Sequence, residues 1–135
     1  MENKQKELEK LLEEIHTFLD FEEFVYVSDP YSKGDQARNV ALAVQYADIL
    51  AQYGVVSYVP HWSHFWHMLY PHSWKFWMGI DLVVLNRCSA IIRIPGESVG
   101  ADLEVLYAEI LGIPVYYSIE EYIKAKGLVK RGESA

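Results

Sequence analysis

The stretch SAIIRIPGESVGADLEVLYAEILG, residues 89–112, has the pattern of a strand, a short loop and a helix in direct succession. Its first part is apolar and is interrupted by Pro95 and Gly96, which predicts a buried strand that ends in a loop. Ser98 is a favoured N-cap residue and Gly112 a favoured C′ residue, so we expect a helix between them. The rest of the chain can be organised around this unit.

The same alternation continues on both sides of it. Strands are predicted at residues 24–27, 55–59 and 113–118, and helices at residues 35–53, 74–88 and 119–127. Strands that alternate with helices at this spacing form a parallel sheet with helices on both faces. The predicted fold is therefore α/β, a Rossmann-like (flavodoxin-like) parallel sheet of four to five strands.

An extra amphipathic helix is predicted at the N-terminus, within residues 1–22. Its apolar residues recur at steps of three and four and form one stripe: Leu8, Leu11, Leu12, Ile15, Phe18 and Leu19. This stripe has to be covered, either by the domain or by a partner subunit. We expect one domain at residues 23–126, followed by a polar tail at residues 127–135.

The composition fits one globular domain and excludes several classes of partner. The chain has 135 residues, of which 51% are hydrophobic and 23% charged. A net charge of -7 argues against nucleic-acid polymers and anionic membranes, because like charges repel. No apolar run approaches the roughly 18 residues of a membrane span. The single cysteine, Cys88, is expected to be a buried side chain, and the absence of a secretory signal predicts a cytoplasmic location.

The loop after the strand at residues 89–95 is the first candidate site. Unpaired N–H groups at a helix N-terminus favour an anion, to which Ser98 can add a hydroxyl and Gly96 and Gly100 a close approach. At about 1.5 Å rise per residue, Glu104 lies roughly 9 Å along the helix from Ser98, within reach of a sugar beyond a bound phosphate. The alternative is that Ser98 only caps the helix and that Glu104 is solvated.

Residues 61–77, HWSHFWHMLYPHSWKFW, contain all four tryptophans and four of the five histidines. His61, His64 and His67 are spaced at i, i+3 and i+6, so on a helix they do not converge on one ion, and no metal is expected. The tryptophans can be core, subunit interface or the wall of a pocket. For the segment as a whole we favour a pocket wall that includes Trp77, with His61 and His64 as polar contacts.

Four segments in order resemble the nucleoside 2-deoxyribosyltransferase-like superfamily, over roughly residues 24–120. They are PYS with the following Arg38, GVVSYVPHWSH, WKFWMGIDLVVLNRC and PGESVGADLEVLYAEILGIPVYY. The resemblance implies that Glu104 is a nucleophile, that Ser98 and Gly100 hold the 5′ end of the substrate, and that Asp81 lies near the departing base. The sequence departs from the family pattern at Asp102, where a small residue is common.

The resemblance also places the first loop against the sugar. Tyr31 is then a partner for the nucleophile, and Ser32 and Arg38 bind the substrate; alternatively, Arg38 neutralises Asp29 or Asp35. Asp81 is either the acid that protonates the departing base or a carboxylate on a helix surface.

Cleavage of an N-glycosidic bond suits two carboxylates in different environments, one ionised and one protonated. We expect Glu104 to stay ionised beside the helix N-terminus, and Asp81 to have a pKa raised by its apolar neighbours.

These observations predict an N-glycosidase or deoxyribosyltransferase that acts on a nucleoside or its 5′-monophosphate. No cofactor is implied, and a homo-oligomer, dimer or tetramer, is expected. One alternative is a non-catalytic nucleotide-binding module of the same fold. The other is a phosphoribohydrolase of the lysine-decarboxylase-like type; the segment PGESVG of this chain loosely resembles the glycine-rich loop of those enzymes.

Overall fold

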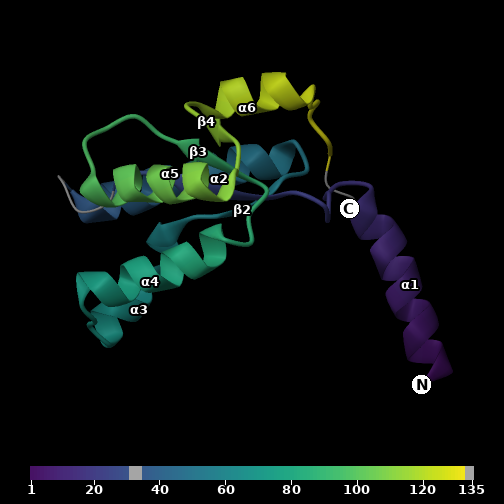
Figure 1. Ribbon diagram of the computed structural model, residues 1–135. Coiled ribbons are helices and arrows are strands. Elements are labelled where there is room, and N and C mark those ends of the chain that lie inside the picture. Colours follow the sequence, from purple (N-terminus) through teal and green to yellow (C-terminus); the bar gives the residue numbers. More distant parts are fainter. Residues whose placement is uncertain (31–34, 133–135) are drawn as a thin grey trace.

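A four-stranded parallel sheet forms the centre of the protein. The computed structural model describes residues 1–30 and 35–132 (Figure 1). Its strands are β1 (Phe24–Ser28), β2 (Val56–Tyr58), β3 (Ala90–Arg93) and β4 (Val115–Tyr116). They pair in the order β2-β1-β3-β4, and every pairing is parallel. The predicted α/β class and the parallel, Rossmann-like sheet are confirmed, with four strands.

Helices connect the strands as the sequence predicts. They are α1 (Glu2–His16), α2 (Gln36–Gln52), α3 (His64–Leu69), α4 (Trp74–Leu85), α5 (Val99–Leu111) and α6 (Ile119–Lys126), with a 3-10 turn, η1 (Pro60–Ser63), before α3. The Ser98 hydroxyl accepts a hydrogen bond from the Ala101 N–H at 3.1 Å, and Gly112 ends α5 in the left-handed conformation. The predicted N-cap at Ser98 and the predicted end at Gly112 of α5 are both confirmed.

The two faces of the sheet bury different helices because side chains alternate along a strand. Val25, Val27 and Ile92 belong to a core cluster that includes residues of α2 and α6. Tyr26 and Ile91 point to the opposite face, where they meet Leu85 of α4 and Ala108 of α5. Cys88 belongs to this second cluster and is buried, as expected. Helices therefore cover both faces of the sheet (Figure 1).

The N-terminal helix α1 extends away from the sheet, and none of its residues is buried (Figure 1). Leu8 and Leu11 of the apolar stripe are 53% and 49% exposed. Leu12, Ile15, Phe18 and Leu19 are half-buried, so the domain leaves only the N-terminal part of the stripe exposed. The division at residues 22 and 126 stays a prediction. Among the described helices, none combines the length and the hydropathy needed to cross a membrane.

Gly96 has a φ of 141°, which L-amino acids with a side chain rarely adopt. A Cβ atom there would lie 2.6 Å from Cγ of Pro30, in the loop that follows β1. The sequence suggested that this glycine admits a ligand. The structure gives it another role, since the missing side chain lets the loops after β1 and β3 pack together.

We expect Gly96→Ala to destabilise the protein by about 1–3 kcal/mol, because both the backbone angle and the contact with Pro30 oppose a side chain. The measurement is the free energy of unfolding in urea. Gly79→Ala is the matched control, since a Cβ atom added to Gly79, in α4, would meet no neighbouring group within 4 Å; we expect it to stabilise by about 0.5–1 kcal/mol. Equal stability of Gly96→Ala and the wild type would contradict the packing role.

Candidate active site

A cavity of about 630 Å³ opens at the carboxyl ends of the strands. Its wall includes Asp29 after β1, Pro60 after β2, and Glu97 and Ser98 after β3. This is the edge at which open parallel sheets bind ligands. Asp81 of α4 and Glu104 of α5 also line the cavity, so the two carboxylates singled out in the sequence meet in one place.

Glu104 is 5% exposed, and two hydroxyl groups hold its carboxylate. Tyr26 donates a short hydrogen bond to Oε2, and Ser28 donates one to Oε1 at 2.8 Å. Both donors lie on β1 and project from the same face of the sheet, being two residues apart. Each oxygen of the carboxylate therefore has a fixed partner, and α5 is tied to the central strand.

Asp81 is held in a similar way by the neighbouring strand. The Tyr58 hydroxyl on β2 donates to Asp81 Oδ1 at 3.1 Å. Tyr58 is the register partner of Tyr26, and the centroids of the two rings are 5.5 Å apart. The parallel pairing of β1 and β2 thus sets two tyrosines side by side, each bonded to one carboxylate.

Burial raises the pKa of both carboxyl groups. It raises the pKa of Glu104 to about 6, although the hydrogen bonds from Tyr26 and Ser28 and the charge of Arg93 act in the opposite direction. It raises the pKa of Asp81 to about 7, with the charge of Glu104 as a second cause, while the Tyr58 hydrogen bond lowers it. The raised pKa of Asp81 has the cause that the sequence indicated. For Glu104, burial raises the pKa, whereas the prediction from the sequence rested only on the helix N-terminus.

A third carboxyl group in the cavity was not singled out by the sequence. Burial raises the pKa of Asp29 to about 6, and the charge of Arg93 lowers it. With Glu97, which is exposed, four carboxyl groups line the cavity. None of the described lining residues is lysine or arginine.

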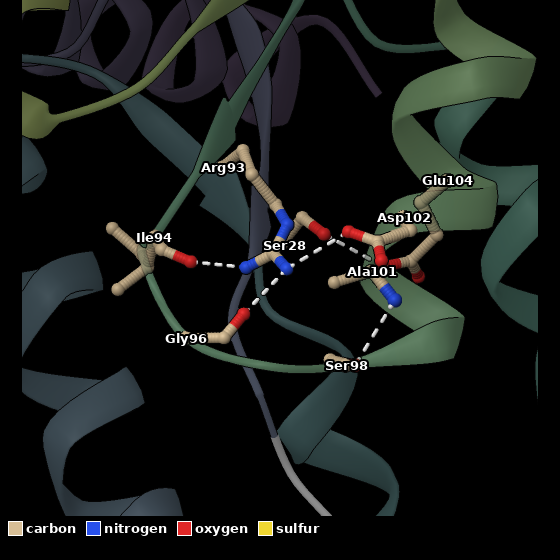
Figure 2. Close-up of polar contacts among 8 residues, drawn as sticks. All are labelled: Ser28, Arg93, Ile94, Gly96, Ser98, Ala101, Asp102 and Glu104. Atoms are coloured by element: carbon tan, nitrogen blue, oxygen red, sulfur yellow. Dashed lines mark hydrogen bonds and ion pairs between the residues drawn. The ribbon is translucent and has the colours of Figure 1, made fainter.

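Arg93, at the end of β3, is buried and braces the loop that leads into α5 (Figure 2). Its guanidinium donates to the carbonyl oxygens of Ile94 and Gly96, the latter at 2.7 Å. It also forms an ion pair with Asp102 at 3.1 Å. Asp102, which departs from the family pattern, therefore has a structural partner in this chain.

The other predicted residues of this loop occupy different places. Ser98 and Gly100 line the cavity, whereas Gly96 does not. A Cβ at Gly100 would lie 3.9 Å from both Ser98 Oγ and Trp74 Nε1, an ordinary contact distance. Ser98 thus combines the capping role with a position on the cavity wall.

The histidine- and tryptophan-rich segment forms one side of the cavity. His67, His72, Trp74 and Trp77 line it, together with Pro60 and Ser63. His61 and His64, predicted as polar contacts, are not among the lining residues. His61 is 2% exposed, and its Nε2 lies 3.2 Å from the Pro30 carbonyl oxygen, so its ring packs behind the wall.

The first loop was predicted to contact the sugar. Tyr31 and Ser32 lie outside the described residues. Arg38 lies in the first turn of α2 and does not line the cavity; its backbone N–H donates to the Asp35 carboxylate at 3.2 Å. In the part of the chain that the structure describes, the partners of Glu104 are Tyr26 and Ser28, where the sequence had suggested Tyr31.

Tyr26, Ser28, Tyr58 and Arg93 contribute to the site, and none of the four was predicted from the sequence. The signal was present for two of them, since Tyr26 and Ser28 are polar positions at spacing two in an otherwise apolar strand. Arg93 at the end of a buried strand was a second signal. Within residues 1–30 and 35–132, no group of three or more His, Cys, Asp or Glu side chains is arranged to hold a metal.

Comparisons with known proteins give similarity at the level of structure. No protein-family model matches the sequence, and none of the curated proteins is a significant match. A 2-deoxyribosyltransferase from Leishmania mexicana is 18% identical, with a TM-score of 0.53 over 69% of this chain and 61% of that one. A 2-deoxyribosyltransferase from Bacillus psychrosaccharolyticus is 20% identical, with a TM-score of 0.49 over 68% and 69% of the two chains.

The chain thus spans less than two thirds of the Leishmania enzyme, and at these identities the likeness concerns the fold. The strand order, the helices on both faces and the cavity at the carboxyl ends of the strands are by themselves those of an open, doubly wound α/β sheet. The protein has a nucleoside 2-deoxyribosyltransferase-like fold.

Proposed function

We propose that this protein cleaves the N-glycosidic bond of 2-deoxynucleosides, with Glu104 as the nucleophile. The observation that carries the proposal is a buried carboxylate on the wall of a cavity, with both oxygens held by hydroxyl groups of the central strand. A second carboxyl group, Asp81, lines the same cavity and has a pKa near neutrality. Such a pair supplies a nucleophile and an acid.

In the proposed reaction, a Glu104 carboxylate oxygen attacks the anomeric carbon of the sugar. A bond forms between oxygen and carbon as the carbon–nitrogen bond breaks, and the electron pair of that bond leaves with the base. Protonated Asp81 transfers its proton to the departing base. In a hydrolase, water then attacks the anomeric carbon; the bond to Glu104 breaks, its electron pair returns to the carboxylate, and the Asp81 carboxylate takes the proton of the water. In a transferase, the nitrogen of a second base attacks instead and gives its proton to Asp81.

The hydrogen bonds of the site fit this division of roles. Tyr26 and Ser28 stabilise the charged form of Glu104, because they donate to it. Asp81 has a higher pKa than Glu104, partly because the negative charge of Glu104 disfavours a second one nearby. The proton therefore resides preferentially on Asp81 when the pair has lost one proton.

The charge of the cavity favours a substrate without a 5′-phosphate. Four carboxyl groups line the described wall and no lysine or arginine does so, so a doubly charged phosphate would meet repulsion. The N-terminus of α5 and the Ser98 hydroxyl remain suitable for a neutral 5′-hydroxyl group. We therefore propose nucleosides, rather than nucleoside monophosphates, as substrates.

We expect the wild-type protein to release free base from at least one 2-deoxynucleoside in a panel that includes the four common ones and their 5′-monophosphates. Glu104→Gln should lower the rate by more than about 10³-fold, since it removes the nucleophile but retains the shape of the side chain. The assay is separation of free base by chromatography. Addition of a second base reveals transfer, because a new nucleoside then forms.

Glu109→Gln is the matched control, because Glu109 is an exposed residue of the same helix and should leave the rate unchanged. Faster cleavage of the monophosphates would contradict the proposed substrate class. Thermal stabilisation by deoxynucleosides without release of base, surviving in Glu104→Gln, would identify a binding module instead.

We expect a bell-shaped dependence of kcat/KM on pH, because this ratio reports the ionisation of the free protein. The rate should rise through about pH 6 as Glu104 loses its proton, and fall above about pH 7 as Asp81 loses its own. Asp81→Asn should lower kcat by about 10²–10⁴-fold and abolish the alkaline decrease, since an amide cannot donate a proton to the base. Asp48→Asn, at an exposed position of α2, is the control. An alkaline decrease that persists in Asp81→Asn would assign the acid to another group.

We also propose that the chain forms a homo-oligomer through α1. An isolated helix of about 15 residues is marginal in water, and α1 has this length and no buried residue. Its exposed leucines lie on one apolar stripe, which suits contact with the same stripe of a second copy.

Sedimentation equilibrium should show a dimer or tetramer for the wild type and a monomer for Leu8→Lys/Leu11→Lys, because charges on the stripe prevent its burial. Leu106→Lys, at a 52% exposed position of α5, should leave the assembly intact. A monomeric wild type would contradict the proposal.

A further inference from the structure

His67 lies in α3, on the aromatic side of the cavity, and is bonded to the next helix. The indole N–H of Trp77, in α4, donates to His67 Nδ1 at 2.7 Å. The backbone N–H of His72 approaches the same nitrogen at 3.3 Å. An indole nitrogen and a backbone amide can only donate, so Nδ1 of His67 must be the acceptor.

This contact determines where the imidazole carries its hydrogen. A neutral imidazole has one N–H group, and a ring nitrogen that accepts a hydrogen bond has none. The hydrogen of neutral His67 is therefore on Nε2. Among the described residues none accepts a hydrogen bond from Nε2, and this atom is not one of the buried, unpartnered ones. It is left as a donor available to a ligand.

Aromatic rings pack around His67. Trp77 packs edge-on against Trp66, with ring centroids 4.8 Å apart. It also packs edge-on against His67, with ring centroids 5.6 Å apart. His72 stacks on Phe76 at 4.0 Å. The donor is thus held by packed rings from α3 and α4, and its cost in conformational entropy on binding is small.

The cavity lining also contains groups of a different chemistry. Asp29, Asp81 and Glu104 offer carboxyl groups, which suit the sugar and the reacting bond. His67 offers a neutral donor beside flat apolar rings. A heteroaromatic base has flat faces for stacking and, on its edge, ring nitrogens or carbonyl oxygens that accept hydrogen bonds.

We infer that His67, held as its Nε2–H tautomer by Trp77, is a specificity-determining residue that donates a hydrogen bond to an acceptor on the edge of the nucleobase. The inference rests on the proposed function and adds to it the group that recognises the base. His67 contacts the ligand, and Trp77 acts as a positioning residue through it.

The tautomer is tested by nitrogen-15 NMR of the histidine-labelled protein without ligand. We expect His67 of the wild type to show the pattern of an Nε2–H imidazole. Trp77→Phe keeps an aromatic ring in the wall but removes the indole N–H, so only the longer contact from the His72 N–H remains and the Nδ1–H tautomer should become more populated than in the wild type. Trp62→Phe is the control, since Trp62 is exposed and does not line the cavity. An Nδ1–H pattern in the wild type would overturn the inference.

Binding is tested by calorimetry with free adenine, hypoxanthine, cytosine and thymine, which requires no turnover. His67→Asn places an acceptor near the position of Nδ1 but lacks the distal donor, and it should weaken the tightest base by roughly threefold to tenfold. His67→Gln places an amide N–H near the position of Nε2 and should stay within about twofold of the wild type. Comparison of the two variants separates the donor from a merely structural role.

Each outcome is distinguishable from failure of the proposed function. If the wild type binds bases in this His67-dependent way but cleaves no deoxynucleoside, the proposed reaction fails and the inference stands. If deoxynucleosides are cleaved and His67→Asn binds bases as tightly as the wild type, the inference fails and the reaction stands. Absence of binding of all four bases to the wild type would also overturn the inference.

Discussion

The buried carboxylate of Glu104 is the constraint on which the arrangement of the site depends. A carboxylate removed from water is destabilised by several kcal/mol unless hydrogen bonds replace its hydration. Tyr26 and Ser28 supply two such bonds from β1, the central strand. Since side chains of one face recur at every second residue, the strand can present both hydroxyls to α5 only in its observed register. The position of α5 and the position of its carboxylate are therefore fixed together.

The second carboxyl group depends on the same sheet. Register pairs Tyr26 with Tyr58, so the donor of Asp81 lies beside the donor of Glu104. Two carboxyl groups that share a cavity cannot both ionise at the pKa of a free side chain, because each charge disfavours the other. The hydroxyl groups then separate the pKa values of the two carboxyl groups, because two hydroxyls donate to Glu104 and one donates to Asp81. This difference is the physical basis for proposing Glu104 as the nucleophile and Asp81 as the acid.

Much of this could be predicted from the sequence, and the remainder could not for identifiable reasons. The alternation of strands and helices is a local pattern, as are the cap at Ser98 and the stop at Gly112, and the structure has all of them. The pairing of Tyr26 with Glu104 joins residues 78 positions apart, which no local period encodes. The role of Gly96 depends on Pro30, a residue of another loop. His61 is buried and is not among the lining residues, and a histidine beside a cavity has the same sequence signal as one packed behind its wall.

Arg93 explains how an acidic cavity can exist beside a helix N-terminus. Its guanidinium is bonded to Ile94, Gly96 and Asp102, all within the loop and the first turn of α5 (Figure 2). These partners take up donors in a rigid fork that would otherwise suit a phosphate. The charge of Arg93 still lowers the pKa of Asp29 and Glu104, so it acts on the cavity through space. An arginine arranged in this way stabilises carboxylates without offering its N–H groups to a ligand. In the proposed reaction, this arrangement leaves the carboxylates free to stabilise positive charge on the reacting carbon and provides no cation for a 5′-phosphate.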